Sequence, residues 1–172
     1  QNAGVLASAK HFPGLGNTPI DTHVALAVIQ GSVDYLKDND LVPFKAVIEA
    51  GIDSIMVNHV QFEALDPKYP STLSSAIIEK LLREDMGFQG LVITDCFEMK
   101  AIADHHTPGE SALLAAQAGN DVILFSHTRS MQNDAYMGLI VAAQAGTLPL
   151  ERIEAANARI KAIKDKYAID VE

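Results

Sequence analysis

The stretch AIIEKLLREDMGFQGLVITD, residues 76–95, decides the fold. It reads as a helix, and Gly87 then stands where a helix ends in a left-handed residue. The run LVIT that follows is almost wholly apolar, which predicts a strand buried on both faces, as in a parallel sheet covered by helices. Asp95 ends the unit as a polar residue at the carboxyl end of that strand.

The same order of helix, glycine, apolar strand and polar end recurs in residues 42–59 and 111–127. Residues 4–12 predict an earlier strand without its helix, and residues 149–169 predict a closing helix that begins at a proline. Such alternation specifies a parallel α/β sheet with right-handed crossovers. Two architectures satisfy it: an open doubly wound sheet, or part of a (β/α)8 barrel.

Polar residues follow each of the predicted strands. These residues are Lys10-His11, Asn58-His59, Thr94-Asp95 and Ser126-His127. The carboxyl ends of parallel strands meet at one edge, where both barrels and open α/β folds build their sites. A strand end is also polar simply because it leaves the core, but ends that together carry His, Lys and Asp favour a functional site.

Composition limits the classes of partner. The chain has 172 residues, 48% of them hydrophobic, with a net charge of −9 and a pI near 5.0. These values describe one globular domain and argue against a nucleic-acid or anionic-membrane surface, which needs clustered Lys and Arg. No apolar run approaches the roughly 18 residues that a membrane span needs, and the lone Cys96 excludes an internal disulfide. The chain begins at Gln1 rather than Met, so we expect its natural N-terminus to lie further upstream.

The segment KHFPGLGNTPIDTH, residues 10–23, concentrates titratable side chains in a loop. Pro13-Gly14 forces the chain off the preceding strand. Asp21 lies two positions before His23, so its carboxylate can bond one imidazole nitrogen and raise the basicity of the other. Such a pair is suited to proton transfer. The alternative is that Asp21 caps the next segment and His23 is solvated.

Asp95 is a second candidate, because a carboxylate at the end of a buried strand is held firmly. A rigid carboxylate can attack a carbon centre or stabilise a cation, although Asp also suits the N-cap of a helix in the following FEMKAIA. Glu98, three residues further on, is an alternative second carboxylate. His105 and His106 are adjacent and therefore point apart, so we expect no metal site, and we expect no cofactor.

Three of these motifs together resemble a known family. KHFPG at residues 10–14, DTH at 21–23 and VITDCFEM at 92–99 are similar to the β-N-acetylhexosaminidases of glycoside hydrolase family 3. The sequence departs from the family pattern at Leu15, where His is common, and at Thr22, where Ser is usual. Neither departure removes a titratable group that the family uses in catalysis.

The resemblance implies a fold and a domain boundary. Residues 1–172 would form a partial TIM-barrel catalytic domain, with about four βα units that match the C-terminal half of a (β/α)8 barrel. The N-terminal half of the barrel would be absent from this chain. A half-barrel would leave its inner apolar face in contact with water, which costs about 25 cal/mol of stability for each Å² exposed. We therefore expect the missing half to exist and to pack against this one.

The resemblance also implies an activity: retaining hydrolysis of terminal β-linked N-acetylglucosamine from a glycoside or muropeptide, as in cell-wall recycling. Asp95 would form the covalent glycosyl-enzyme, and His23, oriented by Asp21, would act as acid and base. The predicted substrate-binding residues are Lys10, His11, Asn58, His59 and Met99.

Other interpretations of the same motifs stay open at this point. The chain could belong to a relative that acts as a β-glucosidase or glycoside phosphorylase, or it could be an inactive sugar-binding fragment of the same fold. Its partner would be a carbohydrate, with no nucleic acid and no membrane. We expect a cytoplasmic location, with secretion as the alternative.

Overall fold

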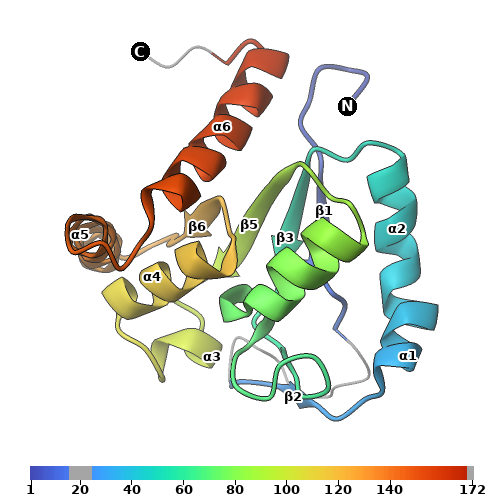
Figure 1. Ribbon diagram of the computed structural model, residues 1–172, viewed down its shortest axis with the longest axis horizontal. Helices are drawn as coiled ribbons and strands as arrows, with labels where there is room; N and C mark the ends of the chain where they lie inside the picture. Colours follow the sequence, from blue (N-terminus) through green and yellow to red (C-terminus); the bar gives the residue numbers. More distant parts are fainter. Residues whose placement is uncertain (16–24, 170–172) are drawn as a thin grey trace.

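The computed structural model describes residues 1–15 and 25–169 (Figure 1). The predicted proton-transfer pair, Asp21 and His23, lies outside these described residues. Within them the main sheet has four strands, all parallel, in the order β1-β3-β5-β6. Their bounds are Ser8–Phe12, Ser54–Val57, Leu91–Cys96 and Val122–Leu124.

The order of the strands in the sheet is the order in which they occur along the chain. A doubly wound sheet reverses its strand order at a switch point, and no such reversal occurs in the described sheet. Consecutive neighbouring strands with helices outside them are instead the arrangement of a TIM barrel. The predicted parallel α/β fold of barrel type is therefore confirmed, and the open doubly wound sheet is not the architecture.

Helical segments connect the strands. Before β3 they are α1 (Val33–Tyr35), η1 (Leu36–Asp40) and α2 (Leu41–Glu49). Between β3 and β6 they are η2 (Ser71–Leu73), η3 (Ala76–Asp85), α3 (Lys100–Ala103) and α4 (Pro108–Ala118). After β6 come α5 (Arg129–Gln144) and α6 (Leu150–Lys166), and β2 (Val28–Ile29) pairs with β4 (Gln61–Phe62) in a small separate sheet.

The core lies between the strands and the helices on one side of the sheet. In the view of Figure 1, η3 (green) lies in front of the sheet, with α2 (cyan) on one side of it and α4 (yellow) on the other. Phe12 of β1 packs edge-on against Phe44 of α2, with ring centroids 5.2 Å apart. Ile77 and Leu82 of η3 are fully buried in the same cluster. Gly87 ends this helical segment with φ +73°, the left-handed conformation that the sequence predicts.

An ion-pair network closes the amino-terminal edge of the sheet. The Asp121 side chain, 1% exposed, receives Arg83 Nη2 at 2.7 Å and Arg159 Nε at 3.0 Å. It also accepts the Val92 backbone N–H at 2.9 Å, so it joins η3, α6 and β5 to the start of β6. Burial lowers the pKa of the Arg83 guanidinium, and the Asp121 charge opposes that shift.

Replacing Asp121 is expected to destabilise the protein strongly. Asp121→Ala removes the nearer carboxylate from the buried Arg83 and leaves it Glu79 Oε1, 3.9 Å from its Nε. Breaking a buried pair in this way costs about 3–5 kcal/mol. The free energy of unfolding from urea titration measures the effect. The matched control is Asp85→Ala, which removes a solvent-exposed pair with Lys80 and is expected to cost less than about 1 kcal/mol. Equal costs for the two variants would contradict this account of the network.

Candidate active site

The carboxyl ends of β1 and β5 bring two of the predicted site residues together. Asp95 Oδ2 lies 3.6 Å from His11 Nε2, and their side chains are 20% and 27% exposed. Strand β3 lies between β1 and β5, so the two side chains meet across it on the same face of the sheet. The Asp95 side chain thus lies at the carboxyl edge of the sheet and points toward the residues that end β1.

The Asp95 carboxylate is oriented by its own backbone. Its Oδ1 accepts the Cys96 N–H at 2.8 Å, while Oδ2 is the oxygen close to His11. The alternative role as a helix N-cap is not the one seen, because α3 begins at Lys100 with Met99 as its N-cap residue. The carboxylate is therefore fixed on one side and partly open to solvent on the other.

Lys10 and His11 also border a hollow of about 320 Å³. Gly14 and Leu15 form the side of the hollow that follows β1, and side chains from residues 39–44 form the other. The hollow is large enough for a sugar-sized ligand, and it adjoins two of the residues predicted to bind substrate.

Asn58 and His59 follow β3 and are buried, with 1% and 0% of their surface exposed. Asn58 Nδ2 donates to the Gly14 carbonyl at 2.5 Å, and its Oδ1 accepts the Val60 N–H at 3.1 Å. The ring nitrogens of His59 lie 2.8 Å from Thr72 Oγ1 and 2.9 Å from the Cys96 carbonyl oxygen. These polar atoms bond within the protein, and the predicted sugar contacts of Asn58 and His59 stay predictions.

Met99, the remaining predicted substrate-binding residue, is 7% exposed. Its backbone N–H donates to the Cys96 carbonyl at 3.1 Å, which closes the turn between β5 and α3. Its predicted contact with a sugar also stays a prediction.

Glu98, the alternative second carboxylate, holds a neighbouring loop. Its Oε1 accepts the Thr128 N–H at 2.8 Å and the His127 N–H at 2.9 Å, immediately before α5. These bonds, that from Thr128 foremost, lower the pKa of Glu98 below its ordinary value. A carboxyl group that is ionised at neutral pH is poorly suited to donate a proton.

Thr72 is a member of this region that sequence reasoning missed. It is fully buried, and its hydroxyl contacts His59. It stands in the run STLSS, whose hydroxyl residues look alike in the sequence, so no signal there singles out Thr72.

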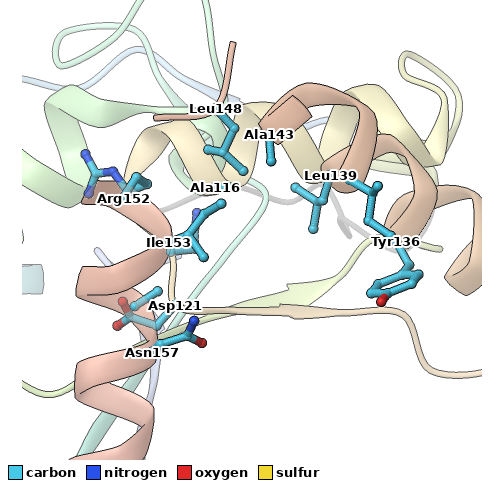
Figure 2. Close-up of a pocket in the computed structure, with 12 residues that line it drawn as sticks. Ala116, Asp121, Tyr136, Leu139, Ala143, Leu148, Arg152, Ile153 and Asn157 are labelled. Atoms are coloured by element: carbon cyan, nitrogen blue, oxygen red, sulfur yellow. The ribbon is translucent and has the colours of Figure 1, made fainter. Parts of the chain in front are cut away.

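A second cavity, of about 270 Å³, lies between α4, α5 and α6 (Figure 2). Tyr136, Leu139 and Ile153 line it with apolar surface, and Asp121 and Arg152 lie among its polar residues. Asp121 precedes β6, so this cavity lies toward the amino-terminal edge of the sheet, opposite Asp95. It is not part of the candidate site.

In residues 1–15 and 25–169, no group of three or more His, Cys, Asp or Glu side chains could hold a metal ion. Among the described helices, none combines the length and the apolar character needed to cross a bilayer.

Comparison with known proteins identifies relatives. The family model described as the glycosyl hydrolase family 3 N terminal domain matches residues 1–163. An uncharacterized secreted glycosyl hydrolase of Arthroderma benhamiae is 35% identical over 96% of this chain and 48% of its own length. Beta-hexosaminidase A of Pseudoalteromonas piscicida is 32% identical over 95% of this chain and 30% of its own length.

Solved structures agree with these relatives. A glycoside hydrolase family 3 β-N-acetylglucosaminidase from Paenibacillus sp. is 42% identical, with a TM-score of 0.96 over 99% of this chain and 33% of its own. The β-glucoside phosphorylase BglX is 28% identical, with a TM-score of 0.90 over 98% of this chain and 32% of its own.

The chain spans half or less of the length of these relatives. The match to the family model and the identity to the curated relatives extend over nearly all of the described fold, including the ends of β1 and β5. The chain therefore belongs to glycosyl hydrolase family 3.

Proposed function

We propose that this chain carries catalytic groups of a retaining exo-β-N-acetylglucosaminidase, which hydrolyses terminal β-linked N-acetylglucosamine. The observation that supports this most is the approach of Asp95 Oδ2 to His11 Nε2 at the carboxyl edge of the sheet, 3.6 Å apart. TIM barrels place their chemistry at this edge. The relatives named β-hexosaminidase and β-N-acetylglucosaminidase supply the substrate class.

Asp95 is the proposed nucleophile. Its carboxylate attacks the anomeric carbon, the bond from that carbon to the leaving oxygen breaks, and a covalent glycosyl ester forms. Water then attacks the same carbon and releases Asp95. The Cys96 N–H holds one carboxylate oxygen in place, so the other can be presented to the sugar without a search through rotamers.

His23, oriented by Asp21, is the proposed acid and base. It protonates the leaving oxygen in the first step and takes a proton from water in the second. The pKa of Glu98 supports this choice indirectly, because that nearby carboxyl group is kept ionised by the backbone N–H groups of Thr128 and His127.

The proposed sugar contacts begin with Lys10 and His11, which border the hollow beside the strand ends. Both carry nitrogen donors that suit hydroxyl groups of a sugar. Asn58, His59 and Met99 remain predicted contacts of the same ligand. The natural partner would be an N-acetylglucosamine-containing glycoside or muropeptide. A cytoplasmic location stays a prediction, and the relative described as secreted favours the alternative.

Phosphorolysis is the second candidate for the reaction. The similarity to a β-glucoside phosphorylase favours it, because phosphate in place of water would release the glycosyl ester as a sugar phosphate. The two reactions share the Asp95 step and differ only in the second nucleophile.

Removing the nucleophile tests the mechanism. In the complete gene product, Asp95→Ala is expected to lower kcat on p-nitrophenyl N-acetylglucosaminide about 10⁴-fold, because no glycosyl ester can form. Added azide is expected to restore release of p-nitrophenol and to yield an α-glycosyl azide, since one displacement inverts the anomeric carbon. Absorbance and NMR of the product measure the two effects.

The controls are the wild-type protein on the N-acetylglucosaminide and on the glucoside, each with and without phosphate. Hydrolysis of the N-acetylglucosaminide without phosphate supports the proposal, and a sugar 1-phosphate as product supports phosphorolysis. Unchanged turnover in Asp95→Ala would rule out Asp95 as the nucleophile.

The choice of acid is tested by the leaving group. His23→Ala is expected to slow substrates with poorly acidic leaving groups about 10²- to 10⁴-fold and to spare dinitrophenyl substrates, which need little protonation. The matched variant is Glu98→Gln, whose amide oxygen can still accept the Thr128 and His127 N–H groups. A plot of log kcat/KM against leaving-group pKa is expected to keep the wild-type slope in Glu98→Gln. If Glu98→Gln steepens the slope and His23→Ala does not, the assignment is reversed.

We further propose that residues outside this chain supply the other half of the barrel. Strands β1 and β6 are the outer strands of the described sheet. Tyr136, Met137 and Val141 of α5 are each more than half exposed, which is unusual for a group of large apolar side chains on one helix. The greater length of the relatives supports the same proposal.

The intact mass of the protein from its natural source tests this proposal. We expect a mass well above 18.5 kDa, or a second polypeptide that copurifies and carries the remaining strands. Mass spectrometry of the active fraction gives the answer. Full activity in a lone 18.5 kDa species would contradict it.

A further inference from the structure

We propose that His59 is a positioning residue for Asp95, and that it acts through the proton on its Nε2. This inference rests on the proposed role of Asp95 as nucleophile. It also gives His59 a different task from the predicted contact with substrate.

The partners of His59 determine where its proton lies. The Cys96 carbonyl oxygen, 2.9 Å from Nε2, has no hydrogen to give, so Nε2 must carry the proton and donate it. Nδ1 is then free of hydrogen in the neutral ring and accepts from the Thr72 hydroxyl at 2.8 Å. Both His59 and Thr72 are 0% exposed, so this pair of side chains is buried within the protein.

Cys96 connects this bond to the nucleophile. Its carbonyl accepts from His59, and its N–H donates to Asp95 Oδ1 at 2.8 Å. The same carbonyl also accepts the Met99 N–H at 3.1 Å, so the turn after β5 is held from two directions. A shift of the Cys96 backbone would therefore move the hydrogen bond that orients the Asp95 carboxylate.

Ring packing holds His59 itself in place. The Phe97 ring meets the imidazole edge-on with centroids 5.2 Å apart, and Phe125 packs against Phe97 at 5.6 Å. The Phe97 N–H donates to the Leu124 carbonyl at 2.9 Å, which ties this cluster to β6. The imidazole is thus buried against its neighbours and forms a fixed support for the turn.

Asn58 makes the equivalent connection on the other side of β3. Its N–H donates to the Phe12 carbonyl at 3.0 Å, and its side chain donates to the Gly14 carbonyl. Two consecutive residues at the end of the middle strand therefore hold the segments that follow β1 and β5. Because the reacting atoms must lie about 3–3.5 Å apart, and a 1 Å misplacement can cost about 100-fold, the loss of such support is expected to appear in kcat.

Two amide variants separate the two nitrogens of the ring. The amide nitrogen of Gln reaches the place of Nε2, and that of Asn reaches the place of Nδ1. In the complete gene product, His59→Gln is expected to keep kcat within about tenfold of wild type, whereas His59→Asn is expected to lower it about 100-fold with little change in KM. Steady-state kinetics on p-nitrophenyl N-acetylglucosaminide and thermal unfolding are measured for both.

Thr72→Val is the third variant, because it removes the hydroxyl that contacts Nδ1 and keeps the Cys96 bond. It is expected to lower the unfolding temperature and to leave kcat within about threefold of wild type. Equal losses of kcat in His59→Gln and His59→Asn, or a loss in Thr72→Val as large as in His59→Asn, would overturn the proposal. If His59→Asn does not fold, a 100-fold loss of kcat in a stable His59→Gln would also overturn the proposal.

Assays of the wild type and of Asp95→Ala alongside these variants distinguish a failure of the proposed function from a failure of the proposed role of His59. An inactive wild type, or an active Asp95→Ala, overturns the proposed function and with it the role of His59. An active wild type and an inactive Asp95→Ala, with the two amide variants alike, overturn the role of His59 alone.

Discussion

The parallel ladder around β3 is the constraint on which the rest of the structure depends. On one side β3 pairs with β1, and on the other it pairs with β5, with Val57 opposite both Phe12 and Thr94. This register brings the residues that end all three strands to one edge. The regular pairing is broken between Lys10 and Phe12, and again between Ile93 and Cys96. Irregular pairing re-aims side chains, and His11 and Asp95 stand at these two interruptions, facing one another across the middle strand.

The stabilising ion pairs and the proposed catalytic groups occupy opposite edges of this sheet. At the amino-terminal edge, Asp121 joins two arginines, and Asp53 receives Lys166 and Tyr167 from the end of α6. These contacts fasten the helices to the strands. Within the described residues, the carboxyl edge instead brings Asp95 and His11 together with side chains that are 20% and 27% exposed. The division is typical of TIM barrels, in which the lower face serves stability and the upper face serves function.

The sequence was informative about the strands and about the place of Asp95 near the end of β5, for physical reasons. Apolar runs, the glycines that end helices and the polar strand ends reflect burial and backbone conformation, which are local properties. The same pattern could not tell a polar side chain that faces a pocket from one that is buried beneath it. Asn58 and His59 are buried in this structure, and their partners Gly14, Cys96 and Thr72 come from distant parts of the chain. Glu98 is a similar case, since its acceptance of two N–H groups next to α5 depends on tertiary structure alone.

The link from Glu98 to the start of α5 affects how the carboxyl edge of the sheet responds to a fall in pH. Glu98 stands three residues after Asp95, so its carboxylate couples the turn that follows the proposed nucleophile to the start of α5. Because the pKa of Glu98 is lowered in the folded state, this coupling is complete above the ordinary titration range of a free glutamate, about 4.3. The coupling is lost only when the pH falls through the lowered pKa of Glu98 and the carboxylate becomes protonated. The bonds from Glu98 to the residues just before α5 therefore survive mild acidification of the surroundings.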